Sequence, residues 1–524
     1  MKRFLAVGVG LLLGAALLPV TAEAQAPERG GWTPAPVAWG VCADPRLQQI
    51  GAECGFVRVP LDYARPDGAK IELAVSRVKH SSSEKDYQGV MLTNPGGPGG
   101  SGLIVPVLGR FVPGGVGADY DWIGFDPRGV GSSRPALSCD VNYTGYNRPD
   151  YVPTTRQIEQ AWLSKAKAYA EACDKAGGPL LDHMKTTDTI ADMESIRRAL
   201  GAKKINFYGL SYGTYLGQVY ATLHPQKVGR MVFDANVDPT RVWYGGNLDQ
   251  NVEFDKASRV FFDWVAEHDE IYHLGTTGKA VRNRFYAERR QLNATPAAGQ
   301  IGPSEWDDIF LSAGYNVNYW PDMATVFSAW ANGKDATGLL DLYAPPGTPG
   351  ADNGYAVYLA TVCTDVTWPR DWATWKRDAW ALHARYPFLT WGNTWFNAPC
   401  RDWGARPGTP VRVDGAKTPP ILLINETGDA ATPFSGALEV RKRFPRSVLV
   451  EGVGGTTHAG SLSGVACVDD TIADYLRDGT LPKRVGGNRS DRQCAPVPVP
   501  DPSAARVADA DGISRADVQQ LIGR

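Results

Sequence analysis

KINFYGLSYGTYLG, residues 204–217, is the stretch that decides the fold. Its first residues are rich in β-branched and aromatic side chains, which favours a buried strand. The G-x-S-x-G pentapeptide that follows ends at Gly213, and a helix is expected from about residue 214 to residue 223. A serine between a strand and a helix lies on a sharp turn above the sheet edge, where its hydroxyl is accessible. The stretch therefore predicts Ser211 as a nucleophile.

Strands and helices alternate on both sides of this turn. Strands that follow one another through helices are usually parallel. The fold class expected is therefore α/β: a mainly parallel central sheet with helices on both faces, preceded by a hairpin around Pro66-Asp67-Gly68. The expected strands lie at 57–61, 71–75, 89–93, 122–126, 204–208, 230–233, 421–425 and 447–450, with a further helix at 188–200.

The alternation stops between residues 239 and 404. Twelve of the 16 tryptophans lie there, and we expect a mostly helical cap in which they pack a core of its own while some line a cleft. The organisation predicted is a signal peptide at 1–24, the two parts of the α/β core at 25–238 and 405–495, the cap insertion at 239–404 and a Pro-rich tail at 496–524.

The N-terminus has the pattern of an export signal. Lys2 and Arg3 precede an apolar run to Val20, and Ala-x-Ala sites for cleavage follow at 22–26. A membrane anchor is the alternative, but the apolar run is short for a span. The mature protein is therefore expected to be secreted or periplasmic and to have no membrane span.

The cysteine count and the net charge indicate the redox environment of the protein and the partners it does not need. All eight cysteines lie in the mature part, and we expect sequential disulfides: Cys42–Cys54, Cys139–Cys173, Cys363–Cys400 and Cys467–Cys494. A metal site is the alternative, but no Cys-x-x-Cys motif or histidine cluster supports it. The net charge of −2 gives no reason to expect nucleic acid as a partner. The sequence does not indicate an oligomeric state.

A nucleophilic serine needs a base, and the base needs an orienting acid. On a sheet of this kind the chain order is serine, acid, histidine. Among the seven histidines, His458 alone lies in a loop just after the last predicted strand. Asp429, after the preceding strand, is the predicted acid. Glu426 is its rival, but it lies closer to the strand end.

Acyl transfer also needs donors for the oxyanion. The backbone N–H of Tyr212, directly after the nucleophile, is one candidate. The second is expected in the loop Asn94-Pro-Gly-Gly-Pro-Gly-Gly-Ser-Gly102, with Gly97 preferred and Gly96 as the close alternative. A phosphate-binding loop is a different interpretation of these glycines, but the Lys-Ser/Thr of a P-loop is missing.

Several of these motifs together resemble the proline iminopeptidase and tripeptidyl aminopeptidase group of α/β-hydrolases. The resemblance covers about residues 38–495, and the chain's length and export signal are closer to the secreted bacterial tripeptidyl aminopeptidases. Pro95 stands where proline iminopeptidases usually carry a histidine. The motifs are Asn94–Gly99, Asp126–Ser133, Gly209–Tyr215, Gly428–Pro433 and Gly455–Gly460.

The resemblance implies a serine exopeptidase that needs no metal or cofactor and acts on peptides with free N-termini. Such enzymes hold the substrate's amino group with carboxylates, and the candidates here are Asp365, Glu426 and Asp126. An esterase or another small-molecule hydrolase is the alternative, because the same triad serves esters and amides. A catalytically inactive binding protein is a third possibility, against which the complete triad argues.

Overall fold

The central element is a ten-stranded sheet in the order β1-β2-β3-β5-β4-β6-β7-β8-β9-β10. It is seen in a computed structural model that describes residues 32–343 and 350–503. The predicted signal peptide and most of the Pro-rich tail therefore lie outside the described residues. The strands are β1 (Gly40–Val41), β2 (Glu53–Pro60), β3 (Lys70–Val78), β4 (Gly89–Asn94), β5 (Tyr120–Phe125), β6 (Ile205–Leu210), β7 (Val228–Asp234), β8 (Leu422–Glu426), β9 (Val448–Gly452) and β10 (Arg492–Cys494).

The sheet is parallel from β5 to β10 and antiparallel at its β1–β3 end. The predicted hairpin is the β2–β3 pair, in which Val57 lies opposite Leu73. The parallel strands place their carboxyl ends at one edge, which is where ligands bind in sheets of this type. The prediction of an α/β fold with a mainly parallel sheet is confirmed.

Helices cover both faces of the sheet. On one face, α3 (Thr186–Ala199), α4 (Tyr212–Leu223) and α14 (Phe434–Arg443) share a hydrophobic cluster with the strands. On the other, α15 (Ala466–Asp478) packs with the 3₁₀ segments η1 (Val105–Phe111) and η2 (Pro113–Asp119). A short helix, α1 (Pro45–Gln49), lies at the same face.

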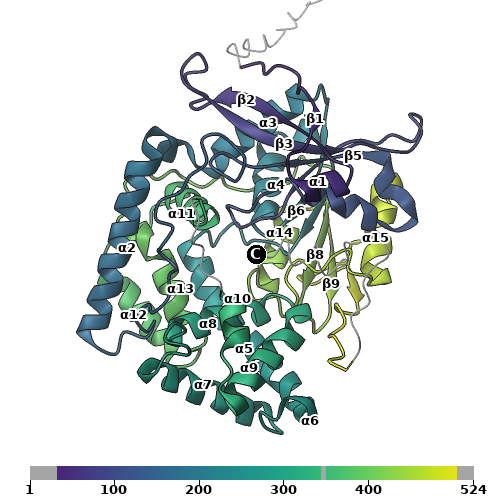
Figure 1. Cartoon of the computed structure of the whole chain (residues 1–524). Helices are drawn as coiled ribbons and strands as arrows, with labels where there is room; N and C mark the ends of the chain where they lie inside the picture. The colour runs from purple at the N-terminus through teal and green to yellow at the C-terminus, as the bar shows by residue number, and fades with distance from the viewer. Residues whose placement is uncertain (1–31, 344–349, 504–524) are drawn as a thin grey trace, which may run out of the picture.

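The chain between β7 and β8 forms a separate group of helices beside the carboxyl edge of the sheet (Figure 1). Nine of the twelve tryptophans in residues 239–404 are buried, so most of them pack cores of this group, as predicted. Its helices are α5 (Tyr244–Glu267), α6 (Asp269–Tyr272), α7 (Gly278–Ala294), α8 (Pro303–Leu311), α9 (Trp320–Gly333), α10 (Thr337–Leu342), α11 (Asn353–Asp365), α12 (Trp372–His383) and α13 (Thr390–Asn397), followed by η7 (Ala398–Arg401). We call α5–α13 with η7 the cap.

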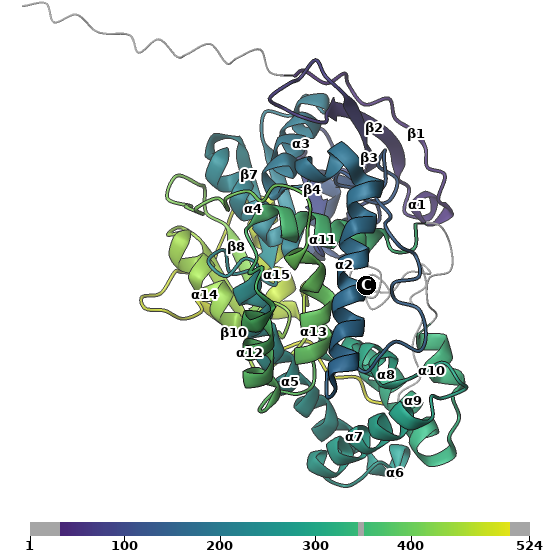
Figure 2. The same ribbon diagram turned by 90° about the vertical axis from the view of Figure 1, so that its left-hand side faces the viewer.

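A long helix that precedes Ser211 in the chain lies among the cap helices. This helix, α2 (Arg156–Gly177), runs beside α11 and α13 in both views (Figures 1 and 2). The ring of Trp162 stacks on that of Trp395, with centroids 5.8 Å apart. No element was predicted here from the sequence. Part of what holds α2 against the cap is remote in sequence, such as the Trp372 indole, which donates to Glu159 at 2.7 Å.

The cysteines pair as predicted. Four disulfides join Cys42 to Cys54, Cys139 to Cys173, Cys363 to Cys400 and Cys467 to Cys494. Two of them fasten the cap side of the molecule: one joins α2 to the segment before it, and another joins α11 to η7. Nowhere in residues 32–343 or 350–503 is there a helix long and apolar enough to cross a membrane.

Candidate active site

Ser211 lies at the point where β6 ends and α4 begins. Its backbone is strained, with φ 54° and ψ −123°, a region that side-chain-bearing residues rarely adopt. Glycine is required on both sides of it. A Cβ at Gly209 would lie 2.6 Å from the carbonyl oxygen of Gly213, and one at Gly213 would lie 2.6 Å from that of Asn94. The first N–H groups of α4 point toward the same region, where they favour negative charge.

His458 and Asp429 are hydrogen-bonded to each other in loops at the carboxyl edge of the sheet. His458 Nδ1 lies 2.9 and 3.0 Å from the two carboxylate oxygens of Asp429. The carboxylate also accepts from the backbone N–H groups of Ala431 and Thr432, both at 3.0 Å, and from the Thr432 hydroxyl at 2.7 Å. These bonds fix the acid, and the acid fixes the ring so that Nε2 is left for other partners.

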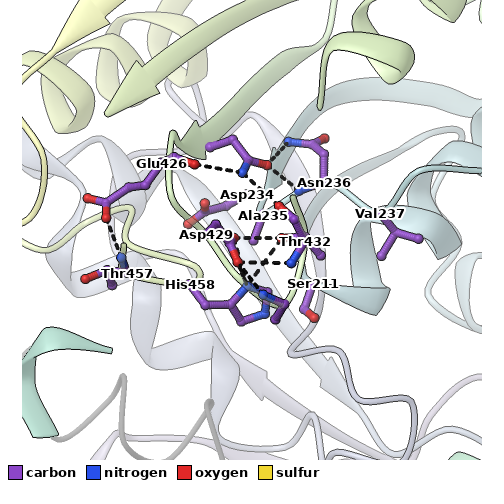
Figure 3. A network of polar contacts seen from close by, with 12 residues as sticks. Ser211, Asp234, Ala235, Asn236, Val237, Glu426, Asp429, Thr432, Thr457 and His458 are labelled. Carbon is purple, nitrogen blue, oxygen red and sulfur yellow. Dashed lines mark hydrogen bonds and ion pairs between the residues drawn. The ribbon is translucent and has the colours of Figure 1, made fainter. Parts of the chain in front are cut away.

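Figure 3 shows the imidazole beside Ser211, and both residues line the same cleft. The backbone N–H of His458 donates to the carbonyl of Tyr315, which belongs to the segment after α8, at 2.7 Å. The loop that carries His458 is therefore attached directly to the cap. The three residues predicted to act together, Ser211, Asp429 and His458, lie in one site.

Two opposing effects act on the His458 imidazole. Burial lowers its pKa, but the negative charge of Asp429, its hydrogen bond and the more distant charge of Asp234 raise it, and the net shift is upward. A raised pKa means that the ring binds a proton readily, which suits a base that must take one from a serine.

Asp234, at the end of β7, is a buried carboxylate that sequence analysis missed. Its side chain accepts from the backbone N–H of Ser461 at 2.8 Å, and its carbonyl accepts from the N–H of Ser211 at 3.0 Å. Burial raises its pKa to about 6. It thus connects the nucleophile turn to the loop that follows His458. Asp234 could have been predicted as a site residue, because it directly follows the predicted strand at 230–233.

The glycine loop after β4 lies over the nucleophile. A Cβ on Gly96 would lie 2.7 Å from the carbonyl oxygen of Leu210 and 2.8 Å from Ser211 Cβ. Gly96 and Gly97 have φ near +103°, which glycine adopts without strain, and both line the cleft. The loop therefore brings the backbone at Gly96 close to Ser211, while the N–H of Gly96 donates to the Asn94 side chain at 3.0 Å. The side chain of Tyr212 points away, with its hydroxyl 2.9 Å from that of Thr186, so only its backbone can face a substrate.

The cleft has a volume of about 450 Å³, within the range of roughly 300–1,000 Å³ found for ligand pockets. The expectation that tryptophans line it is wrong: none of the described ones does. Tyrosine and phenylalanine take that place, because most of the tryptophans are used in the cap's interior. All but two of these aromatic residues come from the cap; Phe111 lies in η1 and Tyr151 precedes α2. The aromatic lining residues are Phe111, Tyr151, Phe254, Tyr315, Tyr319, Tyr355, Tyr358, Phe388 and Phe396.

The three acids expected to bind the substrate's amino group do not line the cleft. Asp365 accepts from the backbone and hydroxyl of Thr186, both at 2.6 Å, and from Trp243 at 3.1 Å. Asp126 accepts from Ser101 at 2.6 Å. Each of these carboxylates is buried and used to hold neighbouring loops together, so this expectation is corrected for both.

Glu426 is the third of these acids, and it was also the rival to Asp429. Its oxygens accept from the backbone N–H groups of Thr457 and Val497 at 2.5 and 2.6 Å. Burial raises its pKa to about 8. It ties the C-terminal segment to the loop that carries His458, and no hydrogen bond joins it to the imidazole.

The carboxylates that do line the cleft are Asp307 and Asp308, on α8 of the cap. Sequence analysis did not single them out, because nothing in the local sequence indicates that α8 faces Ser211. In the described part of the chain, no group of three or more histidine, cysteine, aspartate or glutamate side chains could hold a metal ion.

Known proteins resemble this chain along most of its length. A family model of the alpha/beta hydrolase fold matches residues 89–323, and one described as TAP-like protein matches residues 386–502. The tripeptidyl aminopeptidase of Streptomyces coelicolor is 40% identical over 478 residues, which cover 89% of this chain and 87% of that protein.

Two mycobacterial relatives are more distant. Serine protease Hip1 of Mycobacterium tuberculosis is 30% identical, with 85% of this chain and 90% of that protein covered. A protein of the same organism named carboxylesterase B is also 30% identical, with 90% and 95% covered.

Proposed function

This chain belongs to the α/β-hydrolase family that contains the bacterial tripeptidyl aminopeptidases, and we propose that it releases short peptides, tripeptides in particular, from free N-termini with Ser211 as its nucleophile. Membership of this family makes it a serine peptidase that acts on peptides. The number of residues released and the need for a free amino group are the parts proposed here.

The reaction begins when Ser211 Oγ attacks the scissile carbonyl carbon and gives its proton to Nε2 of His458. Asp429 holds the ring with Nδ1 protonated and stabilises the imidazolium. The C–N bond then breaks, and the imidazolium gives the proton to the leaving amine. Water attacks the resulting ester with His458 as base, which frees the peptide and restores Ser211.

The oxyanion that forms in both steps needs donors placed in advance. We assign this role to the backbone N–H groups of Tyr212 and Gly97. The strained turn at Ser211 and the glycine loop above it support the assignment, because both bring unobstructed backbone close to the nucleophile. Such donors each contribute about 3–4 kcal/mol to catalysis.

One observation carries the proposal: the imidazole of His458, held at 2.9 Å by a buried Asp429, lines the same cleft as a serine on a strained strand-to-helix turn. Hydrogen bonds between a nucleophile and its base often tighten only when substrate binds, so the acid–base pair and the shared cleft are what support the proposal.

We also propose that the protein works outside the cytoplasm, either secreted or in the periplasm. The four disulfides support this location, because disulfides persist in oxidising compartments. Detection of the mature chain, without residues 1–24, in the culture medium or periplasmic fraction is the result expected.

The test of the proposed function compares two chromogenic amides of one tripeptide, one with a free N-terminus and one N-acetylated. The free substrate should be cleaved much faster, with the intact tripeptide as the product seen by mass spectrometry. Ser211→Ala should abolish both reactions, while Ser463→Ala, a serine of a nearby loop that does not line the cleft, is the matched control. Equal rates on the two substrates would contradict the exopeptidase assignment.

Ester hydrolysis is the second candidate, favoured by the relative named carboxylesterase B. The same triad cleaves esters, and fold does not determine substrate. Turnover of simple acyl esters that is much faster than that of any peptide would support this alternative.

A further inference from the structure

We propose that Asp308, presented by α8 and held in place by Arg148 and Tyr151, is the group that binds the substrate's N-terminal ammonium. The inference rests on the proposed aminopeptidase function. It replaces the three acids expected from sequence with one that faces the cleft.

Asp308 is fixed on one side and open on the other. Arg148 donates to one of its oxygens at 2.6 Å, and the Tyr151 hydroxyl donates to the other at 2.8 Å. Its side chain is nevertheless 33% exposed, and Asp308 lines the cleft. Each carboxylate oxygen has two lone pairs, so both can accept a further hydrogen bond. An ammonium, which has three N–H donors and no acceptor, fits such a surface.

The guanidinium of Arg148 does not neutralise this acid, because it is shared. Arg148 also donates to Glu305, a fully buried carboxylate, at 3.0 Å. The neighbouring Arg289 is likewise shared between Asp150 and Asp307, with both contacts at 2.7 Å. Four carboxylates thus face two guanidinium groups, and this wall of the cleft has an excess of negative charge.

One further charged group, Lys165, bears on this balance. Lys165 interacts with Arg148 and Glu305, but burial and the charge of Arg148 lower its pKa, and its ammonium lies over the ring of Tyr143. One added positive charge still leaves the wall negative. Burial, together with the negative charges of Asp150 and Asp308, raises the pKa of Asp307 to about 6, against the opposing effect of Arg289.

The lining of the rest of the cleft is an independent reason to expect a cation. No lysine or arginine is among the lining residues within the described chain, and most of them are aromatic, aliphatic or glycine. Apart from the tyrosines, the ionisable groups that line it are His458, Asp307 and Asp308. A cation that leaves water to enter such a cleft needs a carboxylate partner. An uncharged substrate end would gain no binding energy from such a carboxylate.

Asp308→Asn tests the inference with little change in shape. The amide oxygen can still accept from Arg148, and the amide nitrogen can donate to the Tyr151 hydroxyl, so only the charge is removed. For the free tripeptidyl amide, we expect kcat/KM to fall by about 10- to 100-fold, mainly through KM, because one partner of an enclosed charge pair is lost. For the N-acetylated amide and for p-nitrophenyl butyrate, the rates should not change.

Two further variants complete the design. Asp308→Glu keeps the charge and should retain most of the preference for a free amino group. Asp341→Asn, at an exposed position of α10, is the matched control and should behave as the wild type. The butyrate rate also reports folding, because it needs the catalytic site but no ammonium.

The outcomes separate this inference from the function on which it rests. Preserved discrimination in Asp308→Asn, with an unchanged butyrate rate, would overturn the role of Asp308 and leave the aminopeptidase function intact. A wild-type enzyme that cleaves free and acetylated amides equally would overturn the proposed function itself. Asp308→Asn could also lose the butyrate rate, which would indicate a damaged fold. Asp308→Glu then decides: if it keeps the butyrate rate but cleaves the free amide no faster than the acetylated amide, the ammonium role is refuted as well.

Discussion

Replacing Asp429 by asparagine removes one charge and one acceptor at the most enclosed point of the site. The carboxylate receives bonds from two directions: His458 Nδ1 at 2.9 and 3.0 Å, and the N–H groups and hydroxyl of residues 431–432. An asparagine has only one acceptor oxygen. If that oxygen keeps the backbone bonds, its NH₂ group faces the imidazole.

The magnitude of the effect follows from that geometry. An NH₂ group beside Nδ1 forces this nitrogen to accept, so the proton of the neutral ring moves to Nε2. His458 then has no lone pair directed at Ser211 and cannot take its proton. In the serine protease that serves as the general template, the same change lowers kcat by about 10⁴-fold, which corresponds to about 5.5 kcal/mol. We expect a loss of this order here.

The assay is kcat/KM for a free tripeptidyl amide, measured between pH 5 and pH 9. The wild type should lose activity as pH falls through the raised pKa of His458, because the imidazolium cannot act as a base. Without the charge of Asp429 that pKa falls, so the acidic limb of the residual activity should move to lower pH. Asp341→Asn is the matched control.

Two results would refute the reasoning. One is an Asp429→Asn enzyme with activity within about tenfold of the wild type, since removal of an acid of this kind costs far more. The other is an equally severe loss in Glu426→Gln with Asp429→Asn unaffected, which would transfer the role to the rival acid. An unchanged acidic limb would show that Asp429 does not set the pKa of His458.

Three further predictions concern the supports of the site. Gly96→Ala should reduce the rate of amide hydrolysis severely, because the added Cβ would lie 2.8 Å from Ser211 Cβ. The same clash should lower the free energy of unfolding in urea by about 1–3 kcal/mol, and full activity would contradict this prediction. Replacing both Cys363 and Cys400 by alanine should destabilise the protein by about 4 kcal/mol from the 37-residue separation, visible by calorimetry as a lower Tm. The pKa of Glu426, raised to about 8, means that the folded state binds this proton more tightly than the unfolded state. Its contribution to the free energy of unfolding should therefore fall by up to about 1.4 kcal/mol per pH unit as pH rises from 4.5 to 8, and Glu426→Gln should remove that slope.

Local sequence was sufficient for the parts of the fold that local interactions determine. The eight strands predicted from alternating residues at 57–61 and 71–75 and from apolar runs elsewhere are β2 to β9. The helices expected at 188–200 and 214–223 are α3 and α4. The short strands β1 and β10 were missed because two or three residues carry no periodicity. Helix α2 was missed although its local signals are present: Thr155 caps its start, Gly178 follows its end, and its buried residues recur at helical spacing.

The candidate site divides in the same way. Ser211, Asp429 and His458 could be placed from sequence because each follows a predicted strand, and the carboxyl ends of parallel strands meet at one edge. Asp308 could not, because its position depends on how α8 packs in the cap. Asp365 was a poor choice for a related reason: burial and satisfied hydrogen bonds, which sequence does not reveal, make it a structural acid.

The docking of α2 onto the cap also determines the order in which the molecule can be completed. The ring of Trp395 in α13 stacks on that of Trp162 in α2, which comes far earlier in the chain. Synthesis proceeds from the N-terminus, so Trp162 and its neighbours are made long before the helix that covers them. Nascent chains that end before α13 therefore carry an unsatisfied aromatic surface, which invites chaperone binding or aggregation. A change in tryptophan fluorescence when the Trp162–Trp395 stack forms would show when α13 packs against α2 during folding.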